Sequence, residues 1–251
     1  MVGLIKNIGK AFKSLKWYEI AMCVIMLGIS IYYAILPQEG TPQWLAIINF
    51  FSGLCGIMCV FFCAKANRMT WPFAVVNTIV YMIYLWFFGI WGTFWLEAIV
   101  YMPTNIIGWV MWYKHKDNED KLLAKSKKMK WWQHVIVTVA IIGLTVFVYF
   151  LLSSIAGDTW MRFAVKFGWN TVVMKWIDSA IFAIGIIATF LQMLRYTEQY
   201  GWWLVTDVIA VAQYVIKGDA VYTTKKAIYL VEAVIGLRNW HLLSKKNKEN
   251  E

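Results

Sequence analysis

Polar side chains that could bind a solute stand inside long apolar stretches of this sequence. The acids Asp207 and Glu232 and the amides of Asn77 and Asn105 are each flanked by aliphatic and aromatic residues. An Asp at the centre of a membrane-spanning helix costs about 2.5 to 3.5 kcal/mol on insertion scales, so polar residues retained there are candidates for a binding site. No Lys or Arg lies in the middle of an apolar stretch, where it could neutralise these acids.

Aromatic rings accompany two of these polar groups. Phe73 precedes Asn77 by four residues, and Trp203 precedes Asp207 by four, so ring and polar group share one face of a helix. Acids, amides and ring faces together suit a flat ligand that is rich in hydroxyl groups and carries positive charge, and they disfavour an anion. The alternative is that the polar groups only bond neighbouring helices, at about 1 kcal/mol or less per contact.

Residues for enzyme chemistry are not assembled in this sequence. The three histidines, His115, His134 and His241, lie at the predicted cytoplasmic interface, away from the buried acids. Phosphate-binding loops, zinc-protease motifs and serine-hydrolase motifs are absent from the sequence. The four cysteines all fall within apolar stretches, where we interpret them as packed or lipid-facing thiols. The sequence therefore predicts no enzyme, no cofactor, no metal site and no nucleic-acid partner.

The composition indicates a protein that crosses a lipid bilayer several times. Hydrophobic residues make up 61% of the 251 positions and charged residues only 15%, which excludes an ordinary soluble domain. Apolar stretches long enough to span a membrane predict eight transmembrane helices, most with Trp or Tyr at an end. The predicted spans are residues 17–36, 44–64, 71–88, 94–113, 132–152, 176–194, 202–216 and 227–243. Pro103 is expected to interrupt the fourth span beside Asn105 and to free backbone carbonyls there.

Basic residues predict the orientation. With the N-terminus inside, the inner segments hold 18 of the 24 Lys and Arg residues and the outer segments hold six, including Lys225 and Lys226. This bias predicts that both termini are cytoplasmic. The basic, amphipathic residues before the first span are expected to lie on the inner leaflet, and residues 153–175 to form an outer interfacial loop.

An internal repeat relates two sets of three spans. A shift of 130 residues sets Lys65 on Arg195, Phe73 on Trp203 and Asn77 on Asp207. A shift of 128 then matches three further pairs: Tyr101 with Tyr229, Gly108 with Gly236, and Trp112 with Trp240. Four crossings separate the copies, so they point the same way, and the sequence predicts a parallel repeat of three spans, one connecting span and three spans. The first span stands outside this repeat as an N-terminal addition.

The second set of spans resembles the PnuC family of bacterial vitamin-precursor transporters. That family opens its second triplet with an acid, a W-x-x-W element and a polar residue four places on, and Glu198, Tyr200, Trp203 and Asp207 are similar, with Tyr in place of the first Trp. Each triplet also closes with the family's glycine and tryptophan. The resemblance covers residues 44–243 and implies uptake of nicotinamide riboside by facilitated diffusion, with a cytoplasmic kinase trapping the nucleoside by phosphorylation.

The resemblance implies a substrate site between the two triplets. Trp203 and Asp207 match its motif. Further expected roles are stacking for Phe73, hydrogen bonds and charge for the polar residues, and gating for two tyrosines; the remaining residues are Gln192, Asn77, Asn105, Glu232, Tyr101 and Tyr229. Thiamine or another vitamin stays open as the substrate, as does a membrane receptor or scaffold that transports nothing.

The predicted fold is therefore an all-α membrane protein of the bacterial inner membrane. We expect a lead and additional helix (1–43), a first three-helix bundle (44–113), a connecting region (114–175), a second bundle (176–243) and a charged cytoplasmic tail (244–251). The two bundles should alternate between outward and inward access around one site. The sequence leaves homo-oligomerisation open.

Overall fold

The computed structural model describes residues 9–10, 12–36, 42–87, 91–117, 121–155, 171–216 and 220–249. These residues form helices and connecting turns, and the only strand-like pairing among them is three isolated bridges. The prediction of an all-α protein is confirmed for this part of the chain. The elements in chain order are α2 (Trp17–Ile35), α3 (Gln43–Ala64), α4 (Thr70–Phe87), α5 (Trp91–Leu96), the π-helical turn η1 (Glu97–Tyr101), α6 (Met102–Lys114), α7 (Trp131–Ile155), α9 (Thr171–Met193), α10 (Gln199–Ile216) and α11 (Ala220–Glu249).

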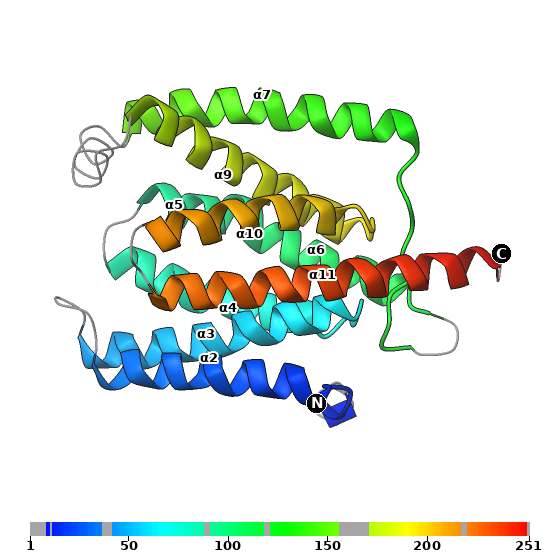
Figure 1. Cartoon of the computed structure of the whole chain (residues 1–251), viewed down its shortest axis with the longest axis horizontal. Helices are drawn as coiled ribbons and strands as arrows, with labels where there is room; N and C mark the ends of the chain where they lie inside the picture. The colour runs from blue at the N-terminus through cyan, green and yellow to red at the C-terminus, as the bar shows by residue number, and fades with distance from the viewer. Residues whose placement is uncertain are drawn as a thin grey trace.

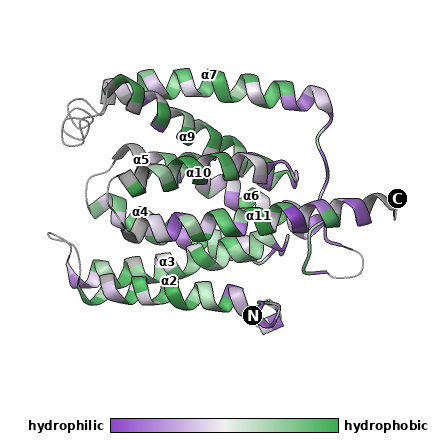
Figure 2. Ribbon diagram, viewed as in Figure 1, coloured by the Kyte–Doolittle hydropathy of each residue, from purple (hydrophilic) through white to green (hydrophobic). Residues whose placement is uncertain are grey.

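Four of the described helices are long and apolar enough to cross a membrane. These stretches are Gln43–Ala64, Thr70–Phe87, Trp131–Leu151 and Lys175–Met193, and α2 contributes a shorter apolar stretch, Trp17–Tyr32. Hydrophobic residues cover most of α2, α3 and α7, while the hydrophilic ones gather toward the end of the bundle that carries both described termini (Figure 2). We call this the terminal end. Large apolar side chains on α7 face outward, as with Phe150 at 65% exposure, which suits contact with lipid.

Six helical segments form a closed ring. Packing runs from α3 to α4, from α4 to α6, from α6 to α9, from α9 to α10, from α10 to α11 and from α11 back to α3. The first three segments follow one another along the chain, as do the last three, so each set corresponds to one predicted triplet. The α11–α3 and α6–α9 contacts join the two sets.

Two long helices among the described residues pack outside the ring. Helix α2 lies against α3, and α7 lies against α9, at opposite sides of the molecule (Figure 1). We expected the first helix to be an addition outside the repeat. Its packing against the first helix of its triplet instead parallels that of α7, so the two outer helices occupy similar places.

The helix from Trp91 to Lys114 changes its winding before Pro103. Proline has no N–H to bond the preceding turn, and its ring needs space there. The π-helical turn Glu97–Tyr101 widens the helix at this point, and the Thr104 hydroxyl donates to the Val100 carbonyl at 2.6 Å. The prediction that Pro103 interrupts regular helix geometry is confirmed, although the chain stays helical throughout.

The turns within the two triplets share one backbone geometry. Ala66 and Arg195 both adopt positive φ, at 53° and 68°, and each follows the end of a first helix. The Asn67 amide donates to the Phe62 carbonyl, as the Tyr196 amide does to Leu191. Equivalent residues here are 129 apart, whereas the sequence comparison paired Lys65 with Arg195 at 130. That comparison was one residue out of register because it matched residue types and had no backbone geometry to align.

The connecting segment before α7 joins both turns at the terminal end. Its Ala124 amide donates to the Ala66 carbonyl at 2.9 Å, and its Lys127 amide donates to the Arg195 carbonyl at 3.0 Å. The Arg195 guanidinium also donates to the Lys125 carbonyl at 3.0 Å. The segment therefore links the two triplets, although the sequence suggested only a basic loop.

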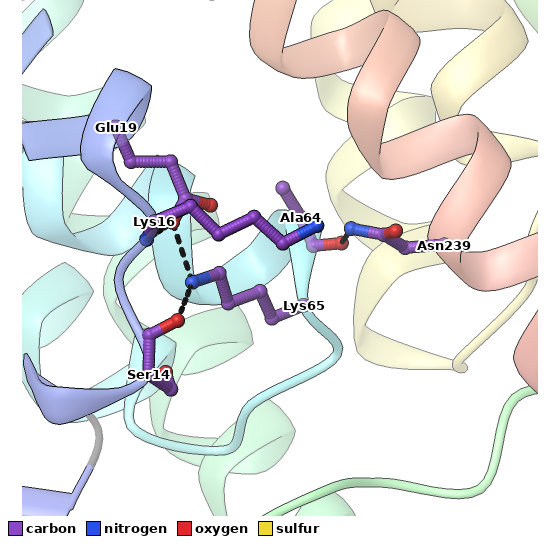
Figure 3. Close-up of polar contacts among 6 residues, drawn as sticks. All are labelled: Ser14, Lys16, Glu19, Ala64, Lys65 and Asn239. Atoms are coloured by element: carbon purple, nitrogen blue, oxygen red, sulfur yellow. Dashed lines mark hydrogen bonds and ion pairs between the residues drawn. The ribbon is translucent and has the colours of Figure 1, made fainter.

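An ion pair at the same end attaches α2 to the ring (Figure 3). Lys65 Nζ lies 2.6 Å from a carboxylate oxygen of Glu19, which is fully buried, and it also donates to the Ser14 carbonyl. The same carboxylate oxygen accepts from the Lys16 amide at 2.6 Å. On the other side of Lys65, the Asn239 amide group of α11 donates to the Ala64 carbonyl at 3.1 Å. Glu19 was not among the expected polar residues, because it lies on α2, outside the two triplets.

Candidate functional site

Polar side chains meet where helices α3, α4 and α11 of the ring pack together. The Ser52 hydroxyl of α3 donates to the Asn77 side-chain carbonyl of α4 at 2.8 Å. Gly56 lies beside both Asn77 and the Tyr229 hydroxyl, since a Cβ placed there would be 3.5 Å and 3.9 Å from them. Side chains of α4 and α11 therefore come close to α3 at this position. Tyr229, which we expected to act as a gate, lies where α11 meets the first triplet.

Asp207 is paired with a lysine, contrary to the sequence-based expectation. Lys226 Nζ of α11 lies 3.2 Å from Asp207 Oδ1 of α10, and the Asp207 side chain is only 7% exposed. Lys226 also lies over the Tyr229 ring, 5.5 Å from its centroid. We placed Lys225 and Lys226 in an outer loop because charge ends an apolar stretch. The helix instead begins at Ala220, which places Lys226 two turns inside it.

A second polar group links α4 to the helix that contains Pro103. The Asn105 side-chain amide donates to the Thr78 hydroxyl at 3.1 Å, and both side chains are buried. At the 129-residue register Thr78, not Asn77, corresponds to Asp207. The expected equivalence of Asn77 and Asp207 is therefore wrong, although the two residues lie at neighbouring levels of the bundle.

Tyr101 reaches the second triplet, while the other expected residues are deeply buried. A Cβ on Gly185 of α9 would be 3.7 Å from the Tyr101 hydroxyl, so this side chain crosses the α6–α9 join. Glu232 is fully buried, and neither carboxylate oxygen has a hydrogen-bond partner among the described residues. Gln192 is buried, and its backbone carbonyl accepts from the Trp112 indole at 3.1 Å. Gln199, also fully buried with neither amide atom bonded in the described part, was missed.

The two rings expected to stack on a ligand belong to different hydrophobic clusters. Phe73 packs against Phe62 and Phe12, with ring centroids 5.5 Å and 6.3 Å away, on the side that faces α2. Trp203 packs against the cluster of tryptophans at the terminal end. The sequence assigned both rings the same role from an identical spacing to a polar residue. The structure does not bring them together, and Trp203 stays the better candidate because it lies on the helix of Asp207.

Tryptophans close the terminal end across the join between the triplets. The Trp112 indole N–H donates to the Gln192 and Met193 carbonyls, at the end of α9, and the Trp240 indole N–H donates to the Cys63 carbonyl, at the end of α3. The last carbonyls of a helix lack partners within it. Amides of the following turns donate to the Cys63 and Gln192 carbonyls, and the indoles donate to the same atoms. Each triplet thus caps the first helix of the other, and the indole rings contact at 5.4 Å between centroids.

This arrangement suits binding of a small polar solute better than catalysis. Contacts between polar side chains of the described residues lie at three of the six ring interfaces, α3–α4, α4–α6 and α10–α11, and they combine carboxylate, amide, hydroxyl and ammonium groups. Two surface grooves, of about 360 and 380 Å³, are lined by apolar side chains and contain none of these polar residues. Among the described residues, no group of three or more His, Cys, Asp or Glu could hold a metal ion.

Comparison with known proteins agrees with this architecture. Residues 46–242 match the family described as nicotinamide mononucleotide transporter. The chain is 28% identical over 232 residues to the nicotinamide riboside transporter PnuC of Haemophilus influenzae, covering 89% of this chain and 91% of that one. It is 22% identical over 241 residues to PnuC of Neisseria mucosa, covering 92% and 83% of the two chains.

A solved structure shares the fold. The crystal structure of the vitamin B3 transporter PnuC superposes with a TM-score of 0.67 at 23% identity and covers 93% of this chain and 94% of its own. The sequence resemblance to PnuC is confirmed by the family match, and the similarity to the PnuC relatives extends beyond the two triplets to the outer helices. Because the family match spans most of its length, this chain belongs to the PnuC family of membrane transporters and is not an enzyme.

Proposed function

We propose that this chain transports nicotinamide riboside across the bacterial inner membrane by facilitated diffusion. The observation that carries the proposal is the convergence of Asp207, Tyr229 and Asn77 at the join of α3, α4, α10 and α11. Nicotinamide riboside joins a flat pyridinium cation to a ribose, so it needs a carboxylate, an aromatic face and hydroxyl-binding groups together. The relatives that carry this substrate in their names support the choice.

Each candidate residue has a role in this proposal. Asp207 balances the pyridinium charge and Trp203 stacks on the ring, while amides and hydroxyls bind the ribose and carboxamide. The residues proposed for those hydrogen bonds are Asn77, Asn105, Gln192 and Glu232, and Tyr101 and Tyr229 act as gates where the triplets join. Phe73 supports the site through packing.

The transport cycle rests on the arrangement of the two triplets. We place eight helices across the membrane, with two parallel sets of three joined by α7 and with α2 beside the first set. The described termini lie at one end of the bundle (Figure 1). The bias of Lys and Arg assigns that end to the cytoplasm. Rocking of one triplet against the other then exposes the site to each side in turn, and a cytoplasmic kinase traps the nucleoside by phosphorylation.

Uptake into proteoliposomes tests the transport proposal. Labelled nicotinamide riboside should equilibrate with the interior without exceeding the outside concentration, and neither a proton nor a sodium gradient should change that endpoint. Enclosing a riboside kinase with ATP should raise the internal label well above equilibrium. Accumulation without a kinase would contradict facilitated diffusion, and equilibration of thiamine in place of the riboside would assign a different vitamin.

Site variants test the residues. Trp203→Ala and Asp207→Asn should each lower the affinity for the riboside at least tenfold, because each removes a contact that the ligand makes directly. Trp131→Ala is the matched control, since this ring on α7 is 78% exposed and lies outside the ring of helices. Equal affinity in all four proteins, each shown to be monodisperse and folded, would place the site elsewhere and favour a receptor or scaffold.

A further inference from the structure

The lysine beside Asp207 changes what a cationic ligand encounters on arrival. Asp207 is the ninth residue of α10, midway along the helix, and Lys226 is the seventh of α11. Their charged atoms are 3.2 Å apart, and the Lys226 side chain is 30% exposed while that of Asp207 is 7% exposed. The carboxylate is thus already neutralised by a partner that is less enclosed than the carboxylate itself.

We propose that Lys226 is the resident counter-ion of Asp207 and that a positively charged ligand displaces it, so that Lys226 determines the preference between charged and uncharged ligands. The inference rests on the proposed function and adds a residue that sets ligand charge. It differs from simple pairing of the ligand with a free acid, because the ligand must compete with an ammonium group of the protein.

Charge balance favours replacement of the Lys226 ammonium by the ligand cation beside Asp207. A carboxylate enclosed between helices is strongly disfavoured without a positive partner. The ammonium of Lys226 meets that need in the empty protein, and a pyridinium ring meets it in the occupied one, so the buried charge is matched in both states. The two cations cannot occupy the space beside Asp207 together, because like charges at such a distance repel.

The side chain of Lys226 is suited to leave. It has four rotatable bonds, and its ammonium is partly exposed, so it can withdraw while its backbone stays in place. Tyr229, one turn further along α11, lies under this ammonium at 5.5 Å and offers it a second contact through the face of the ring. Displacement therefore needs a change of rotamer and no rearrangement of the helix.

Two ligands that differ in charge test this inference. Nicotinamide riboside is a cation, and dihydronicotinamide riboside is a neutral molecule with the same ribose and carboxamide. We would measure the affinity of purified wild-type protein and of Lys226→Met for both by titration calorimetry. Lys226→Met should bind the cation about tenfold more tightly, equal to about 1.4 kcal/mol, and should bind the neutral ligand with unchanged affinity. The ratio of the two affinities isolates charge from other effects of the substitution.

Matched variants distinguish displacement of Lys226 from the effect of removing any positive charge near the site. Lys225→Met removes one positive charge from the neighbouring residue, whose ammonium lies 5.9 Å from the same Tyr229 ring, and should change the ratio less than threefold. In an Asp207→Asn background, Lys226→Met should no longer raise the affinity for the cation, because the shared partner is gone. If Lys226→Met does not fold, Lys226→Gln carries the same expectation, and Lys226→Arg should keep the wild-type ratio.

The outcomes distinguish this inference from the proposed function. Wild-type protein that binds neither ligand would contradict the proposed function itself. Wild-type binding with an equal gain from Lys225→Met and Lys226→Met would leave the function in place and overturn displacement. Weaker binding of both ligands by Lys226→Met would assign this lysine a structural role, which also overturns it.

Discussion

The substitution Gly108→Ala tests the packing that closes the terminal end. Gly108 lies on α6 against the face of Trp71, and a Cβ there would be 2.5 Å from two atoms of the indole ring. Ordinary contact begins near 3.4 Å, so the ring must move by about 1 Å. Trp71 is fully buried and meets the Trp112 ring edge-on at 5.2 Å. Because Trp112 is itself fixed by its hydrogen bond to α9, the ring has little space to move into.

Two opposing effects determine how much Gly108→Ala changes the free energy of unfolding. An overpacked core costs about 1 to 3 kcal/mol, while replacing glycine by alanine within a helix returns up to about 1 kcal/mol. Gly108→Ala should therefore lower the free energy of unfolding by about 1 to 2 kcal/mol. Gly143→Ala on α7 is the control, since a Cβ there meets nothing within 4 Å and only the favourable effect remains.

Thermal unfolding in detergent measures the difference between the two variants. At about 2 to 4 °C per kcal/mol for a domain of this size, Gly108→Ala should melt several degrees below Gly143→Ala. Equal or higher stability of Gly108→Ala would show that the Trp71 ring can retreat without loss, and the rigid closure of this end would then be wrong.

Two further substitutions examine contacts that sequence analysis did not foresee. Trp240→Phe removes the indole donor to the Cys63 carbonyl and should lower stability by about 1 to 2 kcal/mol, whereas Trp131→Phe, at an exposed ring, should not change the melting temperature. Lys65→Met leaves the buried Glu19 carboxylate without its cation, and a loss on the order of 3 kcal/mol is expected. The double variant Glu19→Leu with Lys65→Met should recover most of that loss. Failure to recover it would mean that the unpaired Glu19 carboxylate does not cause the loss of stability in Lys65→Met.

Helices could be predicted from the sequence because their signals are local. Each predicted span overlaps a described helix. The irregular winding before Pro103 could also be predicted, since the missing N–H of a proline acts within one turn. Gly108 and Trp112 were paired with Gly236 and Trp240 through their spacing alone. Their role was not predicted, because it depends on which ring each glycine meets: Trp71 for the first and Tyr200 for the second.

The charged partners could not be predicted because they depend on where helices end and meet. The charge of Lys225 and Lys226 made the last predicted span begin at Ala227. The helix begins seven residues earlier, and Lys226 therefore lies on it, within reach of Asp207. Glu19 and Lys65 are far apart in the sequence and meet only because α2 packs on α3. A hydropathy pattern shows where a lysine lies along the chain. Which group its side chain contacts depends on the helix that packs beside it.

Contacts within and between the triplets have different consequences for a transport cycle. The Trp112 and Trp240 hydrogen bonds and the approach of Tyr101 to Gly185 join one triplet to the other, so the proposed rocking would have to break some of them to open either end. The pair of Lys226 and Asp207 joins α10 to α11, which belong to the same triplet and would move together in the proposed rocking. A rigid-body motion therefore leaves that pair intact, and only a group that enters the site can separate it. This is why the proposed displacement is a property of the ligand's charge and should be detected in binding without any transport.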